Sequence, residues 1–243
     1  MRNFVLGQEE VYKASPTIWS FKKVADIVNN INLRLSNMAG GFPFEFGGHT
    51  WKDSERLYLC GEFSDPTDEH LMVQNALLSA TSGYAAKRFG KAHFRALVRP
   101  DFSTFRLQWM LFVVWQKCKG NTDFQKLLLS VPDDVILIEN TTTDRGGSAE
   151  IWGCKNPVLH NARLNLETVL INRHKGLTRK EMELLVNLET NKVNSVGEWR
   201  GQNNIGKILM ICRDCLAQGT EPEIDYKLLD SSNIYILGKR IFY

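Results

Sequence analysis

The feature that most constrains the fold of this chain is its most apolar run, WMLFVVW, which spans Trp109–Trp115. This run is far shorter than the roughly 20 apolar residues that a membrane-spanning helix requires. It lies inside Ser103–Lys119, which we predict to be one helix. We therefore expect this helix to be buried at the centre of a folded domain, and we expect no membrane partner.

Length, charge and cysteine content are typical of an ordinary globular protein of the cytoplasm. The 243 residues are 43% apolar and carry a net charge of +3, which allows a sizeable core and does not by itself indicate nucleic-acid binding. Met1–Lys13 lacks the apolar region of a signal peptide. Cys212 and Cys215 form a C-x-x-C pair that no second pair completes as a zinc site. We expect both to be reduced core thiols.

Hydrophobic periodicity predicts a mainly helical chain with a few short β-strands, and no point in residues 1–243 forces a domain boundary, so we expect a single domain. Helices are expected over residues 16–35, 82–91, 103–119, 123–130 and 203–219, and from residues 66 and 178 onward. Thr178 and Glu181, three residues apart, predict a capping box at the start of the helix that begins at residue 178. Strands are expected within residues 3–15, 42–46 and 134–140, and as a pair around the turn Asp230–Asn233 in the tail at about 224–243.

Several familiar catalytic motifs are missing from the sequence. There is no G-x-S-x-G, no H-E-x-x-H, no P-loop and no G-x-G-x-x-G. The five histidines show no spacing typical of metal ligands. We therefore expect neither a metal site nor a cofactor, and a serine–histidine hydrolase has no support.

Three polar clusters bordered by aromatic residues remain as candidates. In the first, GHTWKDSERLY, Glu55 follows Asp53 at the start of an apolar run. Glu55 is either an acid in the first turn of a helix that Asp53 caps, or a catalytic carboxylate. The second, ENTTTDRGGSAEIWG, carries the acids Glu139, Asp144 and Glu150 in a loop that ends on Trp152. Such a loop is either a solvated turn or a source of catalytic acids.

The third cluster, WRGQNNIGK, places glycine and amide residues just before a predicted helix. Asn203 or Asn204 is either a helix N-cap, or part of a site where backbone N–H groups meet an anion. Taken together, the three clusters hold the parts needed to bind a nucleotide-sugar phosphate. A carboxylate beside the ribose C1 could stabilise an oxocarbenium-like transition state or activate water, and a tryptophan could stack on a base.

At these residues the chain resembles the NADAR family, also called the YbiA-like family. The blocks that carry the resemblance occur in family order between Leu35 and Leu216: LSNM, GHTWKDSERLYLCGEF, AAKRFGK, ENTTTDRGGSAEIWG and GQNNIGKILMICR. The resemblance implies an α+β, mainly helical fold and metal-free hydrolysis of an N-glycosidic bond. The implied substrate is ADP-ribose attached to guanine in DNA or a nucleotide, made by a DNA-modifying ADP-ribosyltransferase toxin. Alternatives are the ribosylated pyrimidine intermediates of riboflavin synthesis, or ADP-ribose binding without catalysis.

The resemblance also implies roles for individual residues. Glu55 falls on the family's catalytic glutamate, and Asp144 or Glu150 would be the second acid. The residues expected to bind the substrate are Ser36, Asn37, Trp51, Lys87, Arg88, Trp152, Gly153, Gly201, Asn203 and Arg213.

The chain departs from the family pattern in two places that affect the predicted site. Glu62 stands where the family often has a lysine, seven residues after the catalytic glutamate. Residues at about 156–200 separate the W-G and G-x-N blocks, which lie close together in simpler members. We expect this helical insertion to be either a lid or partner-recognition element, or loop decoration.

Overall fold

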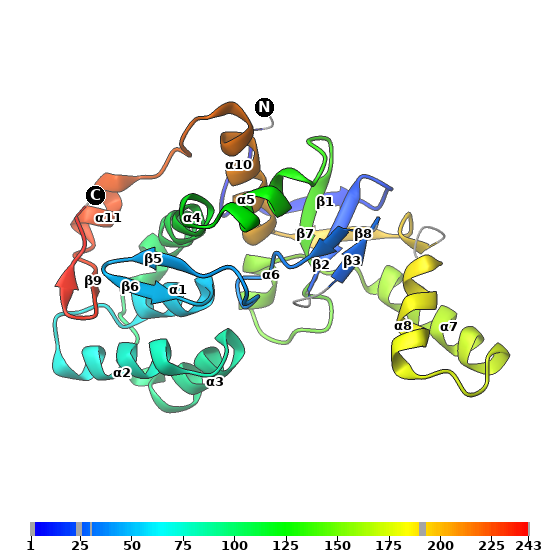
Figure 1. Cartoon of the computed structure of the whole chain (residues 1–243), viewed down its shortest axis with the longest axis horizontal. Coiled ribbons are helices and arrows are strands. Elements are labelled where there is room, and N and C mark those ends of the chain that lie inside the picture. The colour runs from blue at the N-terminus through cyan, green and yellow to red at the C-terminus, as the bar shows by residue number, and fades with distance from the viewer. Residues whose placement is uncertain (1–2, 23–25, 30, 190–192, 243) are drawn as a thin grey trace. The chain divides into compact units, whose positions relative to one another are not determined.

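The central helix predicted from the apolar run is present as α4, Phe102–Gly120, and its Phe105, Trp109 and Val113 are fully buried. The computed structural model describes residues 3–22, 26–29, 31–189 and 193–242. It is mainly helical with short two-stranded sheets, as predicted (Figure 1). Residue contacts divide the chain into unit 1, residues 1–34 and 132–210, and unit 2, residues 35–131 and 211–243. The prediction of one domain over residues 1–243 stays a prediction.

Unit 2 is built around α4, against which α1 packs. The helices of unit 2 are α1 Ser54–Glu62, α2 Asp68–Ser79, α3 Gly83–His93, the 3-10 turn η1 Arg95–Leu97, α4, α5 Thr122–Leu129 and α11 Tyr226–Ser231. α2 and α3 pack on α1 and on each other.

Gly61 allows the close approach of α1 to α4, because a Cβ there would overlap the indole of Trp109. That indole donates a hydrogen bond to the Tyr58 carbonyl at 3.1 Å. Eight of the nine residues of α1 are buried, so its polar side chains are held in a fixed environment.

A β-hairpin leads directly into α1. Strands β5 Phe44–Phe46 and β6 His49–Trp51 pair antiparallel across Gly47 and Gly48. Both glycines have positive φ, +64° and +82°, as a two-residue hairpin turn that follows the twist of the strands requires. The predicted strand or hairpin at this glycine- and phenylalanine-rich stretch is therefore confirmed.

The C-terminal tail differs from its prediction. Tyr226–Ser231 forms the helix α11, because the Asp225 side chain accepts a hydrogen bond from the Leu228 N–H and caps it. The predicted strand before the turn at 230–233 is therefore wrong. A strand pair does follow, β9 Tyr235–Ile236 with β10 Lys239–Arg240.

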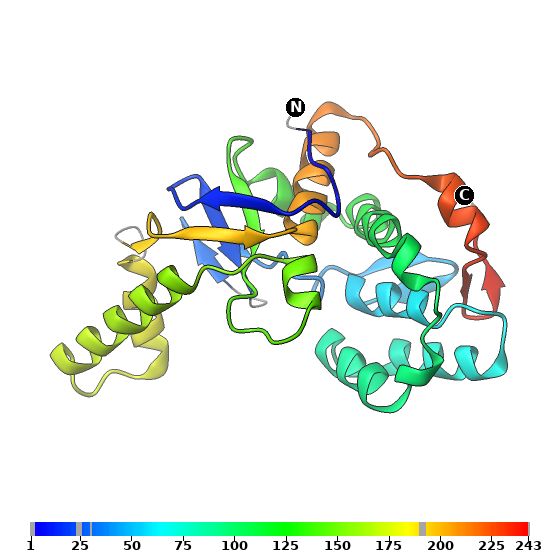
Figure 2. The ribbon, with the colours of Figure 1, turned by 180° about the vertical axis from the view of Figure 1, so that it is seen from behind.

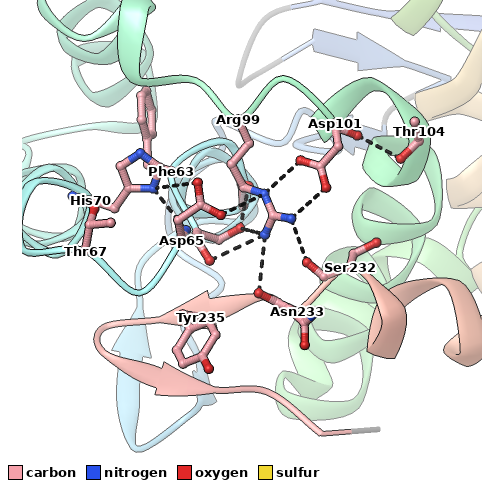
Figure 3. A network of polar contacts seen from close by, with 12 residues as sticks. Phe63, Asp65, Thr67, His70, Arg99, Asp101, Thr104, Ser232, Asn233 and Tyr235 are labelled. Atoms are coloured by element: carbon pink, nitrogen blue, oxygen red, sulfur yellow. Dashed lines mark hydrogen bonds and ion pairs between the residues drawn. The ribbon is translucent and has the colours of Figure 1, made fainter.

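A buried arginine ties this tail to the rest of unit 2. Arg99 donates through Nη1 and Nη2 to the carbonyls of Asn233 and Ser232 at 3.3 and 2.6 Å. The same guanidinium pairs with Asp65 and Asp101 (Figure 3). Charge-assisted bonds to several partners fix one geometry, so the segment after α11 is held against the α1–α2 loop.

Unit 1 contains the parallel pair of β2 Ile18–Phe21 and β7 Ile136–Glu139, and the antiparallel pair of β1 Glu10–Lys13 and β8 Glu198–Gly201. β1 and β8 lie side by side in both views (Figures 1 and 2). A short helix, α6 Ser148–Trp152, follows β7, and residues 204–210 of α10, Asn204–Gln218, also belong to this unit. Its core cluster comprises Tyr12, Ala14, Ile18, Ile138, Cys154, Leu159 and Trp199.

The predicted helix over residues 16–35 is wrong. That region holds β2 and the antiparallel pair of β3 Asp26–Val28 and β4 Ile31–Leu33. Asn29 has φ +46°, which breaks helical geometry, and pairing with β7 places the β-branched and aromatic residues of β2 in a sheet. Val24, part of the helical pattern, lies outside the described residues.

The region predicted as a helical insertion holds α7 Pro157–Arg173 and α8 Arg179–Leu188, which pack on each other. Figure 2 shows the two helices as a pair that follows α6. The predicted capping box at the start of α8 is present, with Thr178 and Glu181 bonded reciprocally. That hydrogen bonding lowers the pKa of the Glu181 carboxyl. The role of this segment stays a prediction.

Candidate functional site

The first cluster forms the start of α1. The Asp53 side chain accepts a hydrogen bond from the Arg56 N–H at 3.1 Å and caps the helix, which places Glu55 in its first turn. Asp53 and Arg56 also form a buried ion pair. Burial raises the pKa of the Asp53 carboxyl, and the Arg56 charge opposes that effect. Both predicted features, the cap and the first-turn acid, are confirmed.

Asn37 fixes the position of Glu55 from outside the helix. Its carbonyl accepts a hydrogen bond from the Glu55 N–H at 3.1 Å, and its side-chain oxygen accepts one from the Ser54 hydroxyl at 3.1 Å. Its amide nitrogen contacts the Met110 sulfur of α4 at 3.0 Å. Ser36, the neighbouring predicted residue, is also buried. The structure therefore brings Asn37 to Glu55 as a support, while Ser36 accepts hydrogen bonds from the backbone N–H groups of Met38 and Ala39.

The Glu55 carboxylate is almost fully enclosed and faces a lysine. The residue is only 4% exposed, and its Oε1 lies 3.4 Å from Nζ of Lys87 on α3. The two groups therefore form a partly buried ion pair between α1 and α3. Arg88, next along α3, is exposed, and its predicted phosphate contact stays a prediction.

Glu62 lies on the same face of α1 as Glu55, because residues separated by seven positions are two turns apart. Tyr58 lies between them on this face and is also buried. Burial, together with the negative charge of Glu55, raises the pKa of Glu62 to about 7. The positive charges of Lys91, Lys87 and Arg106 oppose this shift.

The sequence identified Glu62 only as a departure from the family pattern, and sequence reasoning did not assign it a role. The spacing of seven was the available signal, since it puts two acids on one helix face. What the sequence did not show is how deeply that face is buried.

A pocket of about 340 Å³ opens beside the same helix start. It is lined by Met38, Gly40, Gly41, Pro43, Lys52, Asp53, Arg56, Thr81, Ser82 and Gly83. The pocket thus lies at the N-terminal ends of α1 and α3, directly next to the cap of the helix that carries Glu55.

The acids of the second cluster have a different environment. The Asp144 carboxylate pairs with Lys22 at 2.6 Å and its side chain is 48% exposed. The Glu150 carboxylate pairs with Lys155 at 2.8 Å and its side chain is 61% exposed. Ion pairs this exposed contribute little free energy and are screened by salt. The predicted assistance from Asp144 or Glu150 stays a prediction.

Gly153 of the second cluster and Gly201 of the third cluster each allow the backbone to approach neighbouring backbone closely. A Cβ on Gly153 would overlap the Glu139 carbonyl at the end of β7. Gly201 has φ +150°, and a Cβ there would overlap the Gly153 carbonyl. Trp152 is half-buried at the end of α6. Both glycines, expected to contact substrate, therefore have a packing requirement that explains them.

The side-chain amides of Asn203 and Asn204 in the third cluster form hydrogen bonds with backbone groups of the protein. Asn203 has φ +50° and is completely buried. Its Nδ2 donates to the Leu137 carbonyl at 2.9 Å, and its Oδ1 accepts from the Glu139 N–H at 3.2 Å. Asn204 accepts from the Gly7 N–H at 2.7 Å and donates to the Ile151 carbonyl. This geometry favours a structural joint, in which the Asn203 side chain ties the start of α10 to β7, over an anion site.

Two further predicted residues are buried in unit 2. The Trp51 indole is fully buried and donates to the Phe46 carbonyl at 3.0 Å. Arg213 is 3% exposed and pairs with Asp214. Substrate contacts by these two residues stay predictions.

Cys212 and Cys215 are buried free thiols, as expected.

Within residues 3–22, 26–29, 31–189 and 193–242, the His, Cys, Asp and Glu side chains form no group of three that could hold a metal ion. Over the same ranges, no helix is both long and apolar enough to cross a bilayer.

Comparisons with known proteins place the chain in a family. Residues 22–217 match the model of the NADAR domain. The fold is similar to the solution structure of the Escherichia coli protein YbiA, with a TM-score of 0.50 and 20% sequence identity, over 84% of this chain and 87% of that one. No curated protein matches. Because the domain model covers most of the sequence, this chain belongs to the NADAR family.

Proposed function

We propose that this protein hydrolyses the N-glycosidic bond of a nucleotide-sugar and removes ADP-ribose from guanine, in DNA or in a nucleotide. Family membership supports the general chemistry. The observation that carries the proposal is the environment of Glu55, an enclosed carboxylate that Asp53, Asn37 and the helix hold in place beside Lys87. Such rigid support is typical of a group that must meet a transition state in one orientation.

The geometry supports a specific role for Glu55. Cleavage of a bond between ribose C1 and a base nitrogen develops positive charge on the sugar ring. A carboxylate next to C1 stabilises that charge, and it can also accept a proton from the attacking water. The Lys87 ammonium, 3.4 Å away, pairs with this carboxylate and holds its position. In this proposal water is the nucleophile and neither metal nor cofactor takes part.

The proposed cellular setting follows from the substrate. Guanine that carries ADP-ribose is the product of a DNA-modifying ADP-ribosyltransferase, so a toxin of that kind is the proposed functional counterpart. The reaction would take place in the cytoplasm, where the modified DNA and nucleotides are found.

The test is release of ADP-ribose from a guanine-ADP-ribosylated oligonucleotide by the wild type and by Glu55→Gln. We expect the wild type to release ADP-ribose and the variant to be slower by about 10²- to 10⁴-fold. Glu69→Gln is the matched control, because Glu69 occupies the first turn of α2 after the cap Thr67 and is exposed. The control should retain wild-type activity.

Other outcomes point to the alternatives. A wild type that leaves guanine–ADP-ribose intact but cleaves ribosylated pyrimidine phosphates would overturn the guanine substrate and keep the reaction class. ADP-ribose binding in calorimetry, with no turnover of either glycoside, would overturn the proposed hydrolysis.

A further inference from the structure

α1 presents two acids on one face, one at each end. Glu55 lies in the first turn and Glu62 is the last residue of the helix. At about 1.5 Å of rise per residue, their Cα atoms lie about 10 Å apart along the axis. The two carboxyls therefore stand at opposite ends of a two-turn stripe with Tyr58 between them. This arrangement differs from two acids that share one site.

The ends of this stripe have opposite electrostatic character. Negative charge is favoured in the first turn of a helix and disfavoured in the last, because of the helix dipole. Lys87 contacts the Glu55 carboxylate. Burial is the largest influence on Glu62 and raises its pKa to about 7, so a large share of Glu62 carries a proton at neutral pH. The charged and titratable groups that face Glu62 are Glu55 and Tyr58 from α1, Lys87 and Lys91 from α3, and Arg106 from α4.

One helix face thus holds two carboxyls in different surroundings: Glu55, which pairs with Lys87, and Glu62, whose pKa is raised to about 7. This is the combination that glycoside hydrolysis requires, since one acid must donate a proton to the leaving group while the other accepts one from water or stabilises the sugar. The acids that the sequence predicted as helpers, Asp144 and Glu150, are exposed and paired with surface lysines. Glu62 is half-buried, and its raised pKa makes it better suited to hold a proton.

We propose that Glu62 is a second catalytic residue of this protein and donates the proton that the departing base takes up. This inference rests on the proposed function and adds to it the source of that proton. The protein would then use two carboxyls of one helix, where a family member with lysine at this position could not.

The proposed step balances as follows. The C1–N bond breaks and its electron pair passes to the base nitrogen, which receives the proton of Glu62. A water oxygen bonds to C1, and the proton that this water loses passes to the Glu55 carboxylate. Glu62 ends deprotonated and Glu55 protonated, and exchange with solvent water restores both groups.

The test compares wild type with Glu62→Gln on two substrates across pH 5–9. The first substrate is the guanine-ADP-ribosylated oligonucleotide, whose base leaves with a proton. The second is an ADP-ribosyl nitrophenol glycoside, whose phenolate leaves without one. For the wild type on the first substrate, we expect kcat/KM to fall as pH rises through about 7, because the proton of Glu62 is lost.

For Glu62→Gln, we expect a loss of about 10²-fold or more on the guanine substrate at pH 6, with no fall in rate near pH 7. On the nitrophenol substrate the variant should be nearly as fast as the wild type. This selective rescue separates a proton donor from a structural residue, because a damaged fold slows both substrates alike. Glu69→Gln should match the wild type on both.

Each contrary result has a clear meaning. If the wild type is active and Glu62→Gln keeps both its rate and its fall near pH 7, the role of Glu62 is overturned while the proposed function stands. Equal losses on the two substrates also overturn it, and assign Glu62 to the structure. A wild type inactive on both substrates overturns the proposed hydrolysis, and the role of Glu62 with it.

Discussion

The starts of α1 and α10 are alike in sequence and different in structure. Both have a polar, amide- or acid-rich stretch that leads into an apolar helix. At α1, Asp53 and Asn37 satisfy the backbone and leave the Glu55 carboxylate facing a lysine. At α10, both ends of the Asn203 side-chain amide form hydrogen bonds with the backbone of β7.

Lys207 extends the same contrast at α10. It is fully buried, and its ammonium contacts the carbonyls of Val5 and Gln8 and the carboxylate of Glu10, at 2.6 to 2.9 Å. The side chains of Asn203, Asn204 and Lys207 are thus all engaged with the protein's own chain. The start of a helix is a candidate site only when a reactive side chain remains after the capping groups have bonded to the backbone. At α1 that side chain is Glu55.

The largest expected effect tests whether α1 carries the chemistry. Glu55→Gln should lower kcat/KM by about 10²- to 10⁴-fold, with little change in melting temperature, because the amide keeps the shape of the side chain. Steady-state kinetics with thermal unfolding would check both quantities. An equally large loss for Asp144→Asn would instead assign catalysis to the second cluster.

The next effect tests whether α10 begins with a structural joint. Asn203→Ala should lower the free energy of unfolding by about 2 to 4 kcal/mol, since it leaves the Leu137 carbonyl and the Glu139 N–H without their partner. Denaturant unfolding would measure it, with the exposed Asn75→Ala as control. A stable but inactive Asn203→Ala would point back to a binding role.

Gly206 offers a second test of the contact between α10 and β7, because alanine at this position adds a Cβ atom to it. Gly206→Ala should destabilise by about 1 to 3 kcal/mol, because its Cβ would overlap the Leu137 carbonyl and the Asn203 amide. Alanine normally favours a helix interior over glycine, so a loss would show that the contact decides. Gly147→Ala, with open space around it, is the control.

The pH dependence of stability tests the burial of Glu62. Its pKa in the folded protein, about 7, lies above its ordinary value of 4.5. Neutral Glu62 therefore contributes stability that is fully present below pH 4.5 and lost as pH rises through 7. Relative to Glu62→Gln, the wild type should lose about 3 kcal/mol between pH 4 and pH 8. A constant difference would contradict this burial.

The smallest effect concerns the exposed acids. Asp144→Asn and Glu150→Gln should each change the free energy of unfolding by less than about 1 kcal/mol, because exposed ion pairs are screened by water and salt. Denaturant unfolding at low and high salt would measure the change. A loss above about 2 kcal/mol would show that these pairs are more enclosed than their exposure indicates.

The sequence by itself determined the local features of the protein. Strong periodicity predicted α4, and side-chain chemistry predicted the Asp53 cap, the Thr178–Glu181 capping box and the glycine turn of the β5–β6 hairpin. Order and spacing of the blocks were enough to indicate the family. These features depend on a few neighbouring residues, whose preferences are written in the sequence.

Only the tertiary structure decided which strands form and which polar groups stay available. Ile18–Phe21 became a strand because Ile136–Glu139, more than a hundred residues away, pairs with it. Asn203 was expected to contact substrate, and the structure places its amide on that same β7. Burial and the charge of Glu55 raise the pKa of Glu62 to about 7. Partners distant in sequence set the burial and hydrogen bonding of a group, and these in turn set its pKa and chemistry.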